Sequence, residues 1–156
     1  MTAPMTLADL TRRTGLDVLD HLEREMTIPV IDGLQAQGDL IVVPLDLIDD
    51  VSVAATARLR PVPAGGVELL RGAAGGNPHT LVADPGTCLW TTDVIDPEGL
   101  ALGVLQATAV AYLIHPEHGG TGIAPGAYTI RRQRERVIHR QGRTGYGSTS
   151  NQLVAD

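Results

Sequence analysis

The chain has 156 residues, a formal net charge of −6 and one cysteine, Cys88. This length suits one domain with one hydrophobic core. A lone cysteine excludes an intramolecular disulfide and is typical of a reducing compartment, so we expect a cytoplasmic protein. The sequence has no apolar run as long as a membrane span, and its start lacks the basic and apolar regions of a signal peptide. We therefore expect no membrane partner.

The charge is unevenly distributed along the chain, and all twelve basic residues are arginine. Residues 1–100 carry fifteen acidic residues and six arginines, whereas residues 101–156 carry three acidic residues and six arginines. The first part therefore has a net charge of −9 and the second part +3. A basic region on an acidic body suits an anion, a nucleic acid or the acidic face of another copy. An Arg-rich strand edge facing solvent produces the same pattern.

An N-terminal helical segment is expected within residues 1–30. Thr6 and Asp9 form a capping signal at its start, and leucines follow at helical spacing. The Thr14-Gly15 pair predicts a break between a short first helix and a longer second one. Pro29 ends the helical pattern.

From residue 37 the apolar pattern changes to a period of two, which predicts a β domain over residues 37–139. About seven short strands separated by turn signals indicate a mainly β fold, a small β-barrel or sandwich behind the helical segment. Residues 140–156 are expected to form a loose C-terminal tail. The strands are predicted at residues 39–44, 51–59, 67–70, 80–83, 87–92 and 127–138, with one bent strand or two strands over 100–114.

Three histidines are candidate metal ligands. Pro116 and the glycines after His118 predict a turn, where His115 and His118 can converge although they are three residues apart. His79 ends a glycine-rich loop and supplies a third imidazole. Three such ligands with an open position are typical of a catalytic zinc or iron site. Polar turn histidines that hold no metal are the alternative interpretation.

An Arg-rich stretch is the second candidate site. Strand alternation predicts that Arg132, Arg134 and Arg136 share one face, which suits recognition of phosphate or carboxylate groups. Few aromatic side chains accompany them, so binding of single-stranded nucleic acid by stacking is the weaker hypothesis. A strand edge that faces another copy explains the pattern equally well.

In the order and spacing of several motifs, the sequence resembles a family of small uncharacterised β proteins in bacterial and phage genomes. The motifs are Gly-Asp-Leu-Ile-Val-Val-Pro at 38–44, His79 after its loop, His-x-x-His-Gly at 115–119, and Pro-Gly-x-Tyr-x-Ile-Arg-Arg-Gln-Arg-Glu at 125–135. The resemblance covers roughly residues 37–139 and the last few residues, and it implies no established activity. Two positions depart from the family pattern: Asn77 stands where the loop commonly has a histidine, and Arg136 stands where an aromatic residue is usual.

Three functional hypotheses follow. The leading one is a binding or assembly module that forms a homo-oligomer or binds another protein, with His79, His115 and His118 lining one rim. The second is a metal-dependent hydrolase, in which these histidines hold zinc, iron or manganese and Glu117 acts as the base. The third is an anion or nucleic-acid binder that uses the arginines of residues 131–143.

Overall fold

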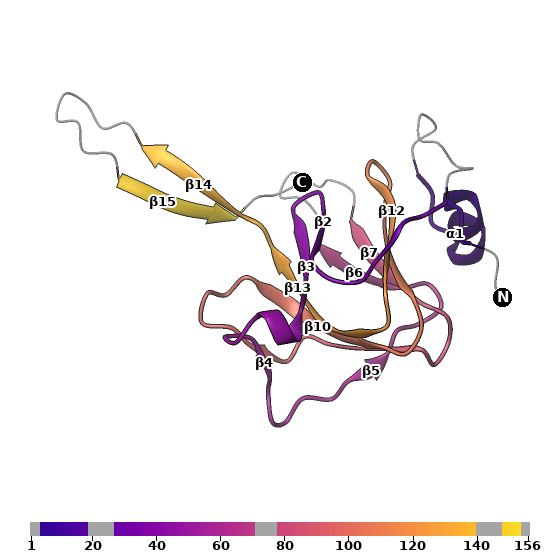
Figure 1. Cartoon of the computed structure of the whole chain (residues 1–156), viewed down its shortest axis with the longest axis horizontal. Coiled ribbons are helices and arrows are strands. Elements are labelled where there is room, and N and C mark those ends of the chain that lie inside the picture. Colours follow the sequence, from indigo (N-terminus) through magenta and orange to yellow (C-terminus); the bar gives the residue numbers. More distant parts are fainter. Residues whose placement is uncertain (1–3, 19–26, 71–77, 140–147, 154–156) are drawn as a thin grey trace.

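A computed structural model describes residues 4–18, 27–70, 78–139 and 148–153. The fold is mainly β, as predicted, and two sheets form its main body (Figure 1). The described strands do not close into a barrel, so the sandwich is the confirmed option. In spatial order, the first sheet contains β1 (Val30–Ile31), β12 (Gly119–Ile123), β11 (Ala111–His115), β7 (His79–Val82) and β6 (Val67–Leu70). The second contains β2 (Gln35–Gln37), β3 (Leu40–Pro44), β13 (Gly126–Arg132), β10 (Ala101–Ala107), β8 (Cys88–Thr91) and β5 (Arg60–Pro61).

The main hydrophobic core lies between the two sheets. Successive side chains of a strand point to opposite faces, so every second residue enters this core. Leu81 and Leu113 reach it from the first sheet, and Val42, Trp90 and Leu105 reach it from the second. The same alternation places His79 on the face of Leu81 and His115 on the face of Leu113. The two histidines therefore lie inside the sandwich.

The structure contains more strands than the seven predicted. Residues 67–70 form β6 as predicted, and the ambiguous stretch 100–114 forms two strands, β10 and β11, that lie in different sheets. β12 covers residues 119–123, and its first two residues, Gly119 and Gly120, were assigned to a turn from the sequence. Of the strand predicted at 51–59, only β4 (Ser52–Val53) forms, and it pairs with β9 (Val94–Ile95). A short 3-10 helix, η1 (Leu45–Leu47), follows β3.

The helix α1 (Leu7–Thr14) covers the outer face of the first sheet. Thr6 caps its start through reciprocal hydrogen bonds with Asp9, and Gly15 ends it with a φ of 72°, which glycine adopts without strain. Its buried leucines, Leu7 and Leu10, belong to a second apolar cluster with residues of β7 and β11. The first helix and its break are as predicted. Residues 16–18 do not continue as a helix, and residues 19–26 lie outside the described residues.

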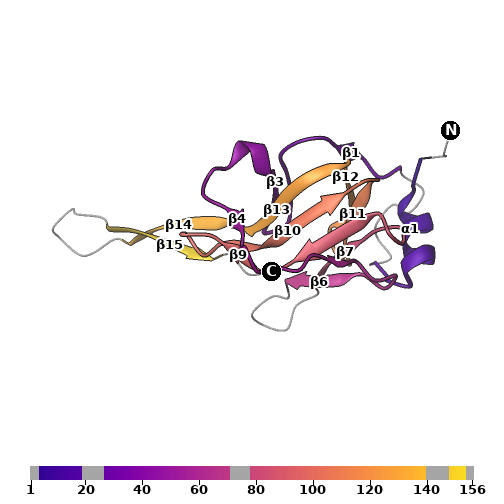
Figure 2. The same ribbon diagram turned by 90° about the horizontal axis from the view of Figure 1, so that it is seen from below.

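A two-stranded arm projects from the body. It consists of β14 (Arg134–His139) and β15 (Ser148–Leu153), and it lies at the end of the molecule opposite α1 (Figures 1 and 2). The strand predicted over 127–138 is therefore divided at Gln133 into β13, in the second sheet, and β14, in the arm. Residues 148–153, expected in the loose tail, form β15. Within the described ranges, no helix has the length and apolar character needed to span a membrane.

Candidate functional site: a buried histidine cluster

The structure brings the three predicted histidines together. His79 begins β7 and His115 ends β11, and these neighbouring antiparallel strands place both residues at the same end of the sandwich. The ring centroids lie 4.4 Å apart for His79 and His115, 4.4 Å for His115 and His118, and 5.9 Å for His79 and His118. His79 and His115 are 0% and 1% exposed, whereas His118 and Glu117 lie at the surface.

Both ring nitrogens of His79 face polar side chains of the other sheet. Its Nδ1 lies 3.0 Å from Gln37 Oε1, and its Nε2 lies 3.2 Å from Asp39 Oδ1. The amide nitrogen of Gln37 donates to the backbone oxygen of Leu113, so the amide oxygen is the atom that faces His79. Because that oxygen can only accept, Nδ1 carries a proton. Nε2 faces the carboxyl group of Asp39, and the two side chains form a buried ion pair when both are charged.

His115 has a different protonation pattern. Its Nδ1 accepts hydrogen bonds from the backbone N–H groups of Glu117, at 3.0 Å, and His118, at 3.3 Å. A ring nitrogen that accepts carries no proton, so His115 is neutral, with its proton on Nε2. These bonds also hold the turn that brings His118 back towards the buried rings.

These hydrogen bonds bear directly on metal binding, because a histidine ligand must offer the lone pair of a ring nitrogen. Nδ1 of His79 donates to Gln37, its Nε2 faces the carboxyl group of Asp39, and the Nδ1 lone pair of His115 accepts from two backbone groups. Among the described residues, no group of three or more His, Cys, Asp or Glu side chains has an arrangement suited to a metal ion. The metal site stays a prediction, and forming it requires these bonds to break.

The polar residues that surround the cluster were not predicted from the sequence. Gln35, Gln37 and Asp39 occupy alternate positions and are 7%, 4% and 2% exposed. Gln35 donates to the backbone of Gly122 on β12, Gln37 to that of Leu113 on β11, and Asp39 meets His79 on β7. This row, here called the polar bridge, therefore crosses three strands of the opposite sheet. The period of two in Gln-x-Gln-x-Asp was the available signal.

The predicted arginine row does not lie on one strand. Arg132 is the last residue of β13, half-buried and opposite Leu40, whereas Arg134 and Arg136 belong to β14 of the arm. The preceding Arg131 forms an ion pair with Glu98 at 2.6 Å and lies 3.9 Å from Asp96. Arg132 and the two arm residues therefore belong to different structural elements.

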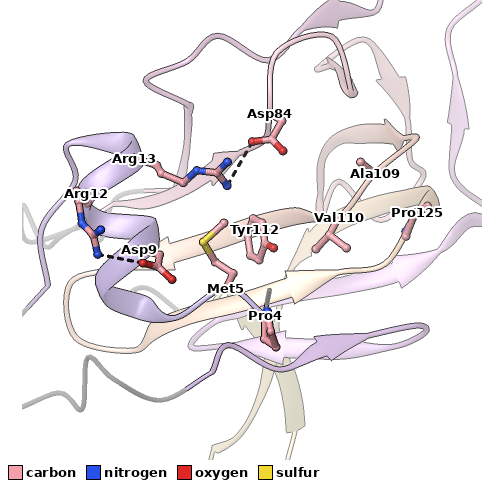
Figure 3. A pocket seen from close by; sticks show the side chains of 10 residues that line it. All are labelled: Pro4, Met5, Asp9, Arg12, Arg13, Asp84, Ala109, Val110, Tyr112 and Pro125. Atoms are coloured by element: carbon pink, nitrogen blue, oxygen red, sulfur yellow. Dashed lines mark hydrogen bonds and ion pairs between the residues drawn. The ribbon is translucent and has the colours of Figure 1, made fainter. Parts of the chain in front are cut away.

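A hollow of about 650 Å³ lies on the other side of the molecule, between α1 and the outer face of β11 (Figure 3). Its charged groups are paired with one another: Arg12 with Asp9 at 3.0 Å, and Arg13 with Asp84 at 3.6 Å. Burial, reinforced by Asp84, raises the pKa of the Tyr112 hydroxyl in this hollow. The candidate histidines are not among its lining residues.

The fold and the site together define a two-sheet β-sandwich domain whose sheets are joined by a buried polar bridge next to a histidine cluster. Residues 36–133 match the family described as Domain of unknown function (DUF8820). The chain belongs to this family, which agrees with the expected resemblance to uncharacterised proteins. No curated protein and no solved structure matches the chain.

Proposed function

We propose that the protein is a homo-oligomeric assembly module whose arm binds the acidic body of a second copy. The observation that carries this proposal is the arm itself. Among the described strands, β14 and β15 pair only with each other. An isolated two-stranded hairpin is at best marginally stable in water, so a surface that packs against it would stabilise it.

Charge supports a second copy as the partner. Two arginines, Arg134 and Arg136, belong to arm strand β14, and residues 101–156 have a net charge of +3, whereas residues 1–100 have a net charge of −9. Opposite charges on two surfaces steer association and fix its register. The arm extends away from its own body, so the acidic surface within its reach would be that of a neighbour (Figures 1 and 2).

Exposed apolar side chains offer a further contact area for the second copy. Val30 on β1 and Leu34 before β2 are 48% and 61% exposed, and both strands are sheet edges. Edge strands have unpaired backbone groups that can add a strand from another chain. We also propose that the protein acts in the cytoplasm, where the thiol of Cys88 stays reduced.

Charge neutralisation in the arm tests this proposal. The double variant Arg134→Gln/Arg136→Gln should lower the sedimentation coefficient to that of a monomer at micromolar concentration. Arg12→Gln/Arg13→Gln loses the same charge from exposed ion pairs on α1 and should leave the oligomer intact. A monomeric wild-type protein would refute the proposal, and displacement of the second copy by an oligonucleotide would assign the arm to nucleic-acid binding instead.

The convergence of three imidazole rings favours a metal-dependent hydrolase as the second candidate function. In this proposal His79, His115 and His118 bind zinc, iron or manganese, and Glu117 activates water as the base. The test is the metal content of tag-free protein by elemental mass spectrometry. Near-stoichiometric metal, lost in both His115→Ala and His118→Ala, would support this function, and no metal uptake on titration would exclude it.

A further inference from the structure

We propose that a second hollow, at one edge of the sandwich, binds a small organic anion that carries one carboxylate or phosphate group on an apolar body. The hollow has a volume of about 370 Å³, within the range of small-molecule sites. β5 and β6, the edge strands of the two sheets, contribute to it. It therefore lies where the interior of the sandwich approaches the surface.

Two arginines supply the charge for this site. Arg58 and Arg60 both line the hollow and are both exposed. Neither forms an ion pair with any described residue, in contrast to Arg12, Arg13 and Arg131. Unpaired guanidinium groups beside a concave surface suit carboxylate or phosphate binding, because their planar donors match those oxygens.

The other polar groups limit the charge of the ligand. Asp93 lines the same hollow, so the two guanidinium groups and this carboxylate sum to a single positive charge. The hydroxyl-bearing residues Thr91 and Thr92 lie beside it. This balance favours a ligand with one anionic group over a polyanion such as a nucleic acid, because Asp93 repels further negative charge.

Trp90 supplies the apolar surface. It lies directly opposite Arg60 in the β5–β8 register, and residues opposite each other in an antiparallel pair share one face. A Cβ atom at Gly103 would overlap with the indole ring and with the backbone oxygen of Thr91, so the ring is held against the backbone of β10. With Val67 from β6, it provides a rigid wall for the apolar part of a ligand.

Trp90 is also the only tryptophan of the chain, so its fluorescence reports on this hollow directly. The experiment titrates the full-length protein with benzoate and with phenyl phosphate, and uses benzyl alcohol as the uncharged control. Benzoate and phenyl phosphate distinguish a carboxylate from a phosphate ligand. We expect a saturable change in Trp90 emission with one or both anions and at least about tenfold weaker binding of benzyl alcohol.

Three variants complete the test. Arg58→Gln and Arg60→Gln should each weaken anion binding by about tenfold, because each removes a charge-assisted hydrogen bond. Arg12→Gln removes an exposed arginine from α1 and should bind like the wild type. The proposal is overturned if neither anion gives a saturable change, or if Arg58→Gln and Arg60→Gln bind as tightly as Arg12→Gln. No residue of this site lies on the arm, so its failure leaves the assembly proposal standing.

Discussion

Replacing Asp39 tests whether the polar bridge holds the two sheets together. Asp39→Leu removes the carboxyl group that faces Nε2 of His79 at 3.2 Å, and both side chains are at most 1% exposed. Loss of one member of a buried hydrogen-bonded pair costs about 1–3 kcal/mol, and about 3–5 kcal/mol where the pair is ionic, because the other member stays away from water. Domains of this size have unfolding free energies of about 5–15 kcal/mol, so the variant should be severely destabilised.

Urea denaturation followed by Trp90 emission measures this cost. Asp39→Asn keeps an oxygen that can accept from His79, so its cost should be smaller, about 1–2 kcal/mol. Asp50→Leu, at an exposed aspartate, is the matched control and should stay within about 0.5 kcal/mol of the wild type. The double variant Asp39→Leu/His79→Leu should be more stable than the sum of the two single effects predicts. A cost below about 1 kcal/mol for Asp39→Leu would refute the reasoning.

Three further predictions concern other parts of the sandwich. Gly103→Ala should lower the unfolding free energy by about 1–3 kcal/mol in urea denaturation, because the added methyl group meets Trp90 and the Thr91 backbone; an unchanged midpoint would contradict this packing. Burial raises the pKa of the Cys88 thiol to about 11, so a thiol reagent at neutral pH should modify it only after unfolding, and rapid labelling of the native protein would show otherwise. Burial tends to raise the pKa of Asp96, but three backbone N–H donors and Arg131 outweigh it and lower that pKa below 3.8. The stabilisation from ionised Asp96 is therefore complete above pH 3.8 and is lost as the pH falls through the lower pKa that Asp96 has in the folded protein. In Asp96→Asn, the free energy of unfolding should therefore fall less steeply as the pH is lowered through the acid range.

The elements predicted correctly from the sequence are those with clear start or end signals in their own residues. β6 has turn signals at its start, and α1 has a capping pair and a terminal glycine, so both were located correctly. β12 was missed because its glycines have low strand propensity. A Cβ atom at Gly120 would lie 3.0 Å from Ile28 Cδ1, and one at Gly122 would lie 2.8 Å from Val30 Cγ2. These glycines therefore reflect close packing against neighbouring segments, which a single sequence does not show.

The candidate site was predicted in part for a similar reason. The turn after β11 and the end of the loop before β7 are visible in the sequence, so the meeting of three histidines could be inferred. The polar bridge was not inferred, because glutamines such as Gln35 and Gln37 at alternate strand positions are usually exposed. They are buried here because each donates to a backbone oxygen of the facing sheet, a contact that depends on how the sheets cross.

The molar mass of the full-length protein in solution tests the assembly proposal most directly. Light scattering during size-exclusion chromatography should give a multiple of the 16.4 kDa chain mass at low ionic strength. Because complementary surface charges are screened by salt, the mass should fall towards 16.4 kDa as the salt concentration rises. A mass of 16.4 kDa at every salt and protein concentration would contradict the account.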